Sequence, residues 1–133
     1  MSIALVKELN GDHRAILKTI GRIGEIGKLT PETRTLIAET REALLHHLAK
    51  EEKEFYPAMR RLADASTAIA EKLTAMNREM EAIAREAMGF LDTYATGGNP
   101  EDFPDDFAKF RRVLSARIQR EEFALYSHFL KTA

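Results

Sequence analysis

The chain has 133 residues, of which 44% are hydrophobic and 31% charged, and its formal net charge is -1. This length fits a single domain over residues 1–133, and the charge gives no electrostatic reason to expect nucleic acid or an anionic membrane as a partner. The absence of cysteine excludes disulfides, thiolate metal ligands and cysteine nucleophiles. Because no run of about 18 apolar residues occurs and charge soon interrupts the N-terminal residues, we expect a cytoplasmic protein.

Four long helices are predicted, because helix breakers gather in three stretches and the segments between them are rich in Ala, Leu, Glu, Lys and Arg. Thr30 as N-cap before Pro31 at the first helical position marks the start of the second helix. The third helix follows Asp64 or Ser66. The four predicted helices cover approximately residues 2–27, 31–61, 66–94 and 104–133.

The connections between these helices predict an all-α fold, an antiparallel up-down-up-down four-helix bundle. Two of the connections are short, so they force neighbouring helices to run in opposite directions, and the longer loop at 96–104 can still join adjacent helices. The third helix carries apolar residues at alternating steps of four and three from Ile69 to Tyr94, as a bundle helix does. An extended helical hairpin that dimerises into a bundle is the competing arrangement.

Polar residues interrupt the inward stripes of three helices. The first helix carries Val6, Leu9, His13, Ile16, Ile20 and Ile23; the second carries Ile37, Thr40, Leu44, His47, Glu51, Phe55 and Ala58; and the fourth carries Phe107, Phe110, Leu114, Arg117, Glu121, Leu125 and His128. At a fixed offset, Leu44, His47, Glu51, Glu52 and Tyr56 align with Leu114, Arg117, Glu121, Glu122 and Tyr126. The second and fourth helices therefore form an internal repeat.

Glu51 and Glu121 on one core require a positive charge between them, because a buried carboxylate is costly unless it is paired or binds a metal. A metal ion suits His47 and Glu51, since side chains four residues apart on a helix point at one place. Arg117 can supply the charge instead. A third interpretation is that these side chains lean to the edge of the bundle and stay solvated, as we expect for His46 and Glu52, which lie off the stripe.

Three segments resemble the hemerythrin-like (HHE cation-binding) domain: Asp12-His13-Arg14, HHLAKEEKEFYPAM at 46–59 and ARIQREEFALYSHF at 116–129. The resemblance covers essentially the whole chain. It implies a four-helix bundle with a non-haem di-iron centre, held by five histidines and two bridging carboxylates, and roles in dioxygen binding or in iron or redox sensing. Carried over by position, His13 and His47 are implied as terminal ligands of one iron, and Glu51 and Glu121 as the bridging carboxylates.

The sequence departs from this family pattern at the second iron. The family's third helix supplies two histidines, whereas this chain has no histidine between His47 and His128. Either Asn77 with Glu81 or Met76 with Met80 stand at the corresponding positions, and the histidine of the fourth helix corresponds to Arg117. We therefore expect no full di-iron centre.

We hypothesise that the Arg117 guanidinium occupies the space of the second metal and pairs with Glu121 or Glu51. This leaves at most a weak site for one iron at His13, His47, Glu51 and Glu121, to which Glu81 is a further, weaker candidate ligand. No catalytic or cofactor-binding residues are assigned.

Two functions follow from these alternatives, and the first is favoured. It is a non-enzymatic regulatory, signalling or interaction protein with an incomplete di-iron site, which acts on an unidentified protein partner as a monomer or homodimer. The second is an iron or dioxygen binder, or an iron or redox sensor, with a carboxylate-rich site that requires Glu81 to turn inward. An oxidoreductase ranks last, because it needs a redox metal with an open coordination position.

Overall fold

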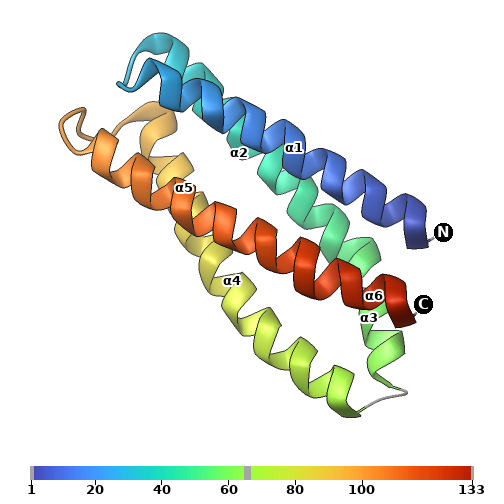
Figure 1. Cartoon of the computed structure of the whole chain (residues 1–133). Helices are drawn as coiled ribbons and strands as arrows, with labels where there is room; N and C mark the ends of the chain where they lie inside the picture. Colours follow the sequence, from blue (N-terminus) through green and yellow to red (C-terminus); the bar gives the residue numbers. More distant parts are fainter. Residues whose placement is uncertain (1, 65–66, 133) are drawn as a thin grey trace.

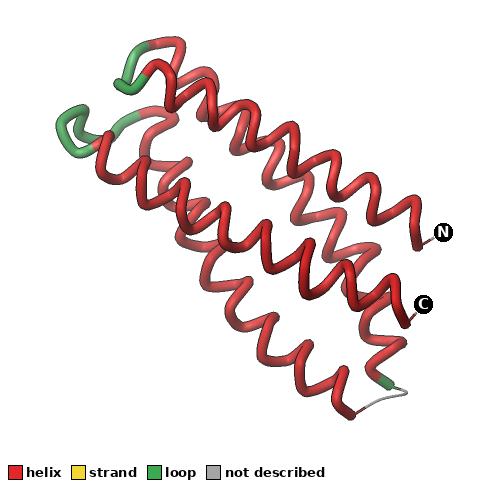
Figure 2. Tube along the Cα trace, in the orientation of Figure 1, coloured by secondary structure: helices red, strands yellow, loops and turns green. Residues whose placement is uncertain are grey.

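The computed structural model describes residues 2–64 and 67–132, and within these ranges the chain is helical, without strands (Figures 1 and 2). None of the helices in this part of the chain is both long and apolar enough to cross a membrane. The helical segments are α1 (Ser2–Ile26), α2 (Pro31–Lys50), η1 (Glu51–Phe55), α3 (Tyr56–Ala63), α4 (Thr67–Thr96), α5 (Phe103–Arg120), η2 (Glu121–Tyr126) and α6 (Ser127–Thr132).

These segments form the predicted four-helix bundle. The segments α2, η1 and α3 follow one another without a break, as do α5, η2 and α6, so each set forms one long helix beside α1 and α4. Packing follows chain order, with α1 against α2, α2 against α4 and α4 against α5. Both chain ends lie at the same end of the bundle (Figure 1). The four helices thus pack within one chain, and the extended hairpin is wrong.

The helix boundaries agree closely with the local signals. The Thr30 hydroxyl accepts a hydrogen bond of 3.1 Å from the Thr33 N–H, which confirms the predicted N-cap before Pro31. Gly27 ends α1 with a φ of 73°, a conformation that glycine adopts without steric cost. The third helix begins at Thr67, and its alternative start at Ser66 lies outside the described residues.

The core consists of two apolar clusters with a polar layer between them. One cluster fills the end of the bundle with the two loops and includes Ile20, Ile37, Leu91, Phe103 and Leu114. The other lies toward the chain ends and includes Leu9, Phe55, Met59, Leu125 and Phe129. Between them are buried polar side chains from three of the four helices: His13, His47, Glu51, Arg117 and Glu121.

The second and fourth helices each contain a π-helical turn, η1 and η2, at the level of this polar layer. In η1 the Tyr56 N–H donates to the Glu51 carbonyl oxygen, five residues back. A π-turn holds more residues than an α-turn, so inward positions recur every four residues and reach Met59, whereas Ala58 is only partly buried. Ala58 still packs against the apolar cluster near the chain ends, as the predicted stripe requires, but Met59 is the more deeply buried residue. In the fourth helix Phe129 is buried, and the His128 side chain lies outside the described part of the chain.

Candidate metal centre

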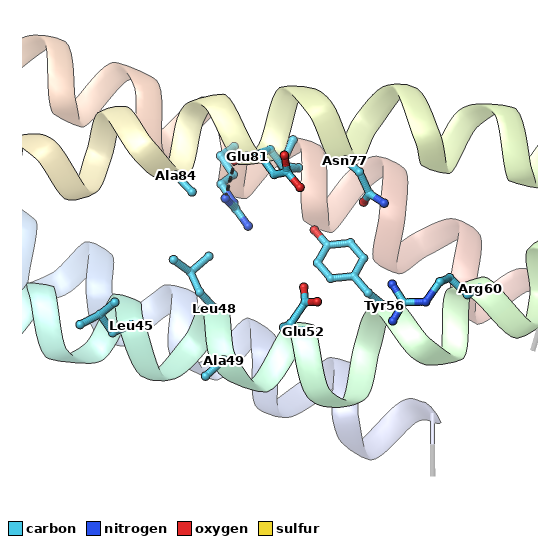
Figure 3. A pocket seen from close by; sticks show the side chains of 11 residues that line it. Leu45, Leu48, Ala49, Glu52, Tyr56, Arg60, Asn77, Glu81 and Ala84 are labelled. Atoms are coloured by element: carbon cyan, nitrogen blue, oxygen red, sulfur yellow. Dashed lines mark hydrogen bonds between the residues drawn. The ribbon is translucent and has the colours of Figure 1, made fainter.

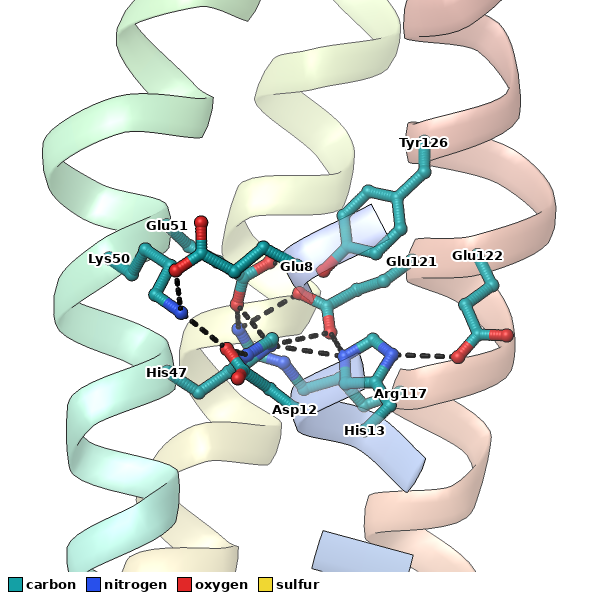
Figure 4. A network of polar contacts seen from close by, with 10 residues as sticks. All are labelled: Glu8, Asp12, His13, His47, Lys50, Glu51, Arg117, Glu121, Glu122 and Tyr126. Carbon is teal, nitrogen blue, oxygen red and sulfur yellow. Dashed lines mark hydrogen bonds and ion pairs between the residues drawn. The ribbon is translucent and has the colours of Figure 1, made fainter. Parts of the chain in front are cut away.

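Two histidines from adjacent helices face each other inside the polar layer (Figure 4). His13 lies at the middle of α1, and His47 lies in the last turn of α2. Their Nε2 atoms are 3.0 Å apart, and both residues are at most 2% exposed. The inner nitrogens of both rings therefore share one small, dry space.

The outer nitrogen of each ring is fixed by a carboxylate. His13 Nδ1 lies 2.7 Å from Glu122 Oε2, and His47 Nδ1 lies 3.0 Å from Asp12 Oδ2. When both Nδ1–H groups donate to these carboxylates, the two Nε2 lone pairs point at each other. A proton or a metal ion must then lie between them. Metal-binding histidines are commonly oriented by carboxylates in this way.

Glu51 and Glu121 complete the inner group. Glu121 Oε1 lies 3.0 Å from His13 Nε2, and Glu51 Oε1 lies 3.2 Å from His47 Nε2. Ligand atoms of His13, His47 and Glu121 all lie within 4.8 Å of one another. Two nitrogens each about 2.1 Å from one metal ion stand roughly 3 Å apart when they bind at right angles, which matches the observed separation. The group can therefore hold one metal ion.

Charges inside this group are strongly coupled. Burial by itself lowers the pKa of His47, but hydrogen bonds with Glu121, Glu51 and Asp12 raise it to about 10. Burial and the neighbouring Glu121 raise the pKa of Glu51 to about 7. Burial works against ionisation of Glu121 as well, yet its hydrogen bonds to Glu51 and the histidines hold its pKa well below the usual range. Without a metal ion, a protonated His47 supplies the compensating charge.

Arg117 reaches the same carboxylates from α5. Its Nη2 atom lies 3.5 Å from both Glu51 Oε1 and Glu121 Oε2, and Nη1 donates to the Met80 carbonyl oxygen at 2.8 Å. Arg117 is 4% exposed. The two carboxylates thus lie between a pair of imidazoles and a guanidinium, which is permanently charged.

Further side chains stabilise this arrangement. The Tyr126 hydroxyl donates a hydrogen bond of 2.8 Å to Glu51 Oε2. Lys50 contacts Asp12 at 2.9 Å and Glu8 at 2.8 Å, so the carboxylate behind His47 is itself paired. Every inner carboxylate therefore has a hydrogen-bonding partner, as buried charges require.

The sequence-predicted residues His13, His47, Glu51, Glu121 and Arg117 are gathered in this layer. Glu81 is not: it is exposed on α4 and lies outside the His13, His47 and Glu121 group. His46 and Glu52 are exposed, as expected.

Sequence reasoning did not assign the partners Asp12, Glu122 and Tyr126. Two signals were available: Asp12 is adjacent to His13, and Glu122 and Tyr126 belong to the internal repeat. Neither signal shows that Asp12 contacts His47 rather than its own neighbour, because that contact depends on how α1 packs on α2.

Comparison with known proteins identifies one family. Residues 4–129 match the family described as hemerythrin HHE cation binding domain. No curated protein and no solved structure matches the chain.

Proposed function

The chain belongs to the hemerythrin HHE cation-binding domain family. We propose that it is a non-enzymatic regulatory or interaction protein holding at most one metal ion. The position of Arg117 carries this proposal. A guanidinium lies against the two carboxylates that are expected to bridge two irons, on the side away from the histidine pair. The fold is retained while half of the metal chemistry is replaced by an ion pair.

A single ion fits the residues that are present. His13, His47 and Glu121 would hold it, with Glu51 within reach of the same space. When bound, a divalent ion supplies the positive charge that a proton otherwise provides between the two imidazoles. Asp12 and Glu122 keep both rings oriented whether or not the ion is there.

A second ion does not fit. No histidine occurs between His47 and His128, so α4 cannot provide imidazole ligands. Glu81 is exposed, which leaves the carboxylate-rich alternative without a supporting observation. Arginine is not deprotonated in proteins, so an ion beside Arg117 meets a fixed positive charge.

A regulatory role is supported by how deeply the centre is enclosed. His13, His47, Glu51 and Glu121 are each exposed by 2% or less, and the histidine pair has its carboxylate partners already in place. Such a centre is suited to stabilising one bundle conformation that a protein partner recognises. The proposal thus includes a protein partner, which the chain would bind as a monomer or as a homodimer.

Metal analysis tests the proposal directly. Protein without a histidine tag is purified with iron available, and metal content and the visible spectrum are measured. We expect one equivalent of metal or less and no oxo-bridge absorption band. The double variant His13→Ala with His47→Ala is the control and should lose the bound metal. Two equivalents of iron with an oxo-bridge band would refute the proposal.

A further inference from the structure

A cavity of about 470 Å³ lies on the opposite side of Arg117 from the metal centre. One wall comes from α2, η1 and α3, the facing wall comes from α4, and Arg117 of α5 contributes to the lining. Figure 3 shows Glu52 and Tyr56 on the first wall and Asn77 and Glu81 on the second. A cavity of this size accommodates a small molecule.

Several polar side chains of this cavity lack partners within the described part of the chain. Tyr56 is 8% exposed, and its hydroxyl forms no hydrogen bond with any described residue. The side chains of Glu52, Asn77 and Glu81 likewise form neither hydrogen bonds nor ion pairs there. The Tyr56 hydroxyl lines the cavity and is therefore available to hydrogen-bond with a ligand there.

Arg117 offers hydrogen-bond donors to the cavity as well. A guanidinium has five N–H groups, and the one short hydrogen bond of Arg117 goes to the Met80 carbonyl oxygen. Its contacts with Glu51 and Glu121 are long, at 3.5 Å each. Spare donors therefore remain in the cavity that the Tyr56 hydroxyl also lines, and these two groups suit a planar carboxylate.

The remaining lining is complementary to the rest of a small zwitterion. Glu52 and Glu81 lie on facing walls and carry unpaired negative charge that suits an ammonium group (Figure 3). Leu48, Met80 and Ala84 offer apolar surface for an alkyl group. These three kinds of surface match the three parts of an aliphatic amino acid, and Arg60 adds a second cation to the lining.

We propose that this cavity binds a small aliphatic α-amino acid, with its carboxylate at Arg117 and Tyr56, its ammonium group between Glu52 and Glu81, and its side chain against Leu48 and Ala84. The inference goes beyond the regulatory function proposed above and does not depend on a bound metal. It gives the molecule a second ligand site, separated from the histidine pair by the two buried carboxylates.

Isothermal titration of chelator-treated protein tests this site, with leucine as the probe. We expect saturable binding of leucine at one site per chain. Two analogues separate the parts of the ligand: 4-methylpentanoate lacks the ammonium group and 3-methylbutylamine lacks the carboxylate. Each is expected to bind about tenfold more weakly or worse, because a charged hydrogen-bonding group is lost.

Matched variants locate the binding. Ala84→Leu fills the cavity and should abolish leucine binding, whereas Ala82→Leu on the exposed face of α4 should leave it unchanged. Tyr56→Phe should weaken binding about tenfold through loss of the free hydroxyl. Circular dichroism checks that each variant is folded, and Tyr56→Phe decides the matter should Ala84→Leu unfold.

Absence of saturable leucine binding would overturn the inference. So would equal binding by the Tyr56→Phe variant and the parent, or binding of 4-methylpentanoate as tight as that of leucine. Metal content is measured on separate samples without amino acid, so either proposal can fail while the other stands.

Discussion

The second and fourth helices present the same residue pattern to the core, but they meet different partners. Each has a π-helical turn that begins at an inward glutamate, Glu51 in one and Glu121 in the other. One turn before that glutamate stands His47 in the second helix and Arg117 in the fourth. His47 faces the imidazole of His13, whereas Arg117 donates to a backbone carbonyl of α4.

The residues beyond these glutamates differ in the same way. Glu122 holds the ring of His13 at 2.7 Å, while its counterpart Glu52 is exposed and has no partner among residues 2–64 and 67–132. Tyr126 donates to Glu51, while the hydroxyl of its counterpart Tyr56 lines a cavity and bonds to no residue that the structure describes. On the side of the histidine pair, hydrogen bonds therefore join the polar side chains to one another. On the side of α4, the corresponding side chains line a cavity. Equivalent polar residues of the repeat thus have different roles, because only one of the two sets faces a histidine pair.

The largest expected effect on the free energy of unfolding comes from removing the guanidinium of Arg117. Arg117→Ala leaves Glu51 and Glu121 without their guanidinium, and loss of one partner of a buried ion pair costs about 3–5 kcal/mol. Urea unfolding of the metal-free protein measures this. Arg120→Ala is the control, because its ion pair with Glu79 is exposed and its loss should change little. An unchanged unfolding midpoint for Arg117→Ala would show that Arg117 does not stabilise the two buried carboxylates.

Glu122 and Glu52 offer a direct test across the repeat. Glu122→Gln weakens the hold on His13, so metal affinity should fall about 10- to 100-fold. Glu52→Gln should leave metal affinity unchanged, since Glu52 touches no histidine in the described structure. Competition with a chromophoric chelator, using Zn²⁺, measures both. Equal losses in the two variants would contradict the assignment of the metal to the His13 side.

His47 can lose its proton and then bind a metal ion, whereas Arg117 cannot. The pKa of His47 is raised to about 10 without metal, and that of Glu51 to about 7, so between these values binding displaces one proton, from His47. Affinity for Zn²⁺ should therefore rise with pH, about tenfold from pH 7 to pH 8. A fall or a flat profile over this interval would mean that His47 is not a ligand.

The two tyrosines should show the smallest difference. Tyr126→Phe removes a hydrogen bond from Glu51 and should cost about 1 kcal/mol of unfolding free energy. Tyr56→Phe removes no hydrogen bond within the described structure and should be close to neutral in ligand-free protein. Urea unfolding of both variants decides. A larger cost for Tyr56→Phe would mean that its hydroxyl is already satisfied.

The sequence predicted the helices and the polar layer well, because both depend on local spacing. Caps such as Thr30 and inward positions such as His47 follow from neighbours three or four residues away. The spacing did not predict the π-turns, which bury Met59 more deeply than Ala58. Nor did it predict which carboxylate fixes which histidine, because the contact of Asp12 with His47 depends on how two helices pack.

The π-turns also affect how the chain tolerates changes in length. A π-turn behaves like an α-helix with one additional residue that the flanking helices do not need for their own packing. If the exposed Lys53 is deleted, η1 can therefore become an ordinary α-helical turn, and α3 still packs against α4. The same deletion in the middle of α4 would rotate everything beyond it by about 100°. A single residue can thus be inserted or deleted at the level of the polar layer. Such a change would alter the positions of the candidate metal ligands while the rest of the bundle keeps its packing.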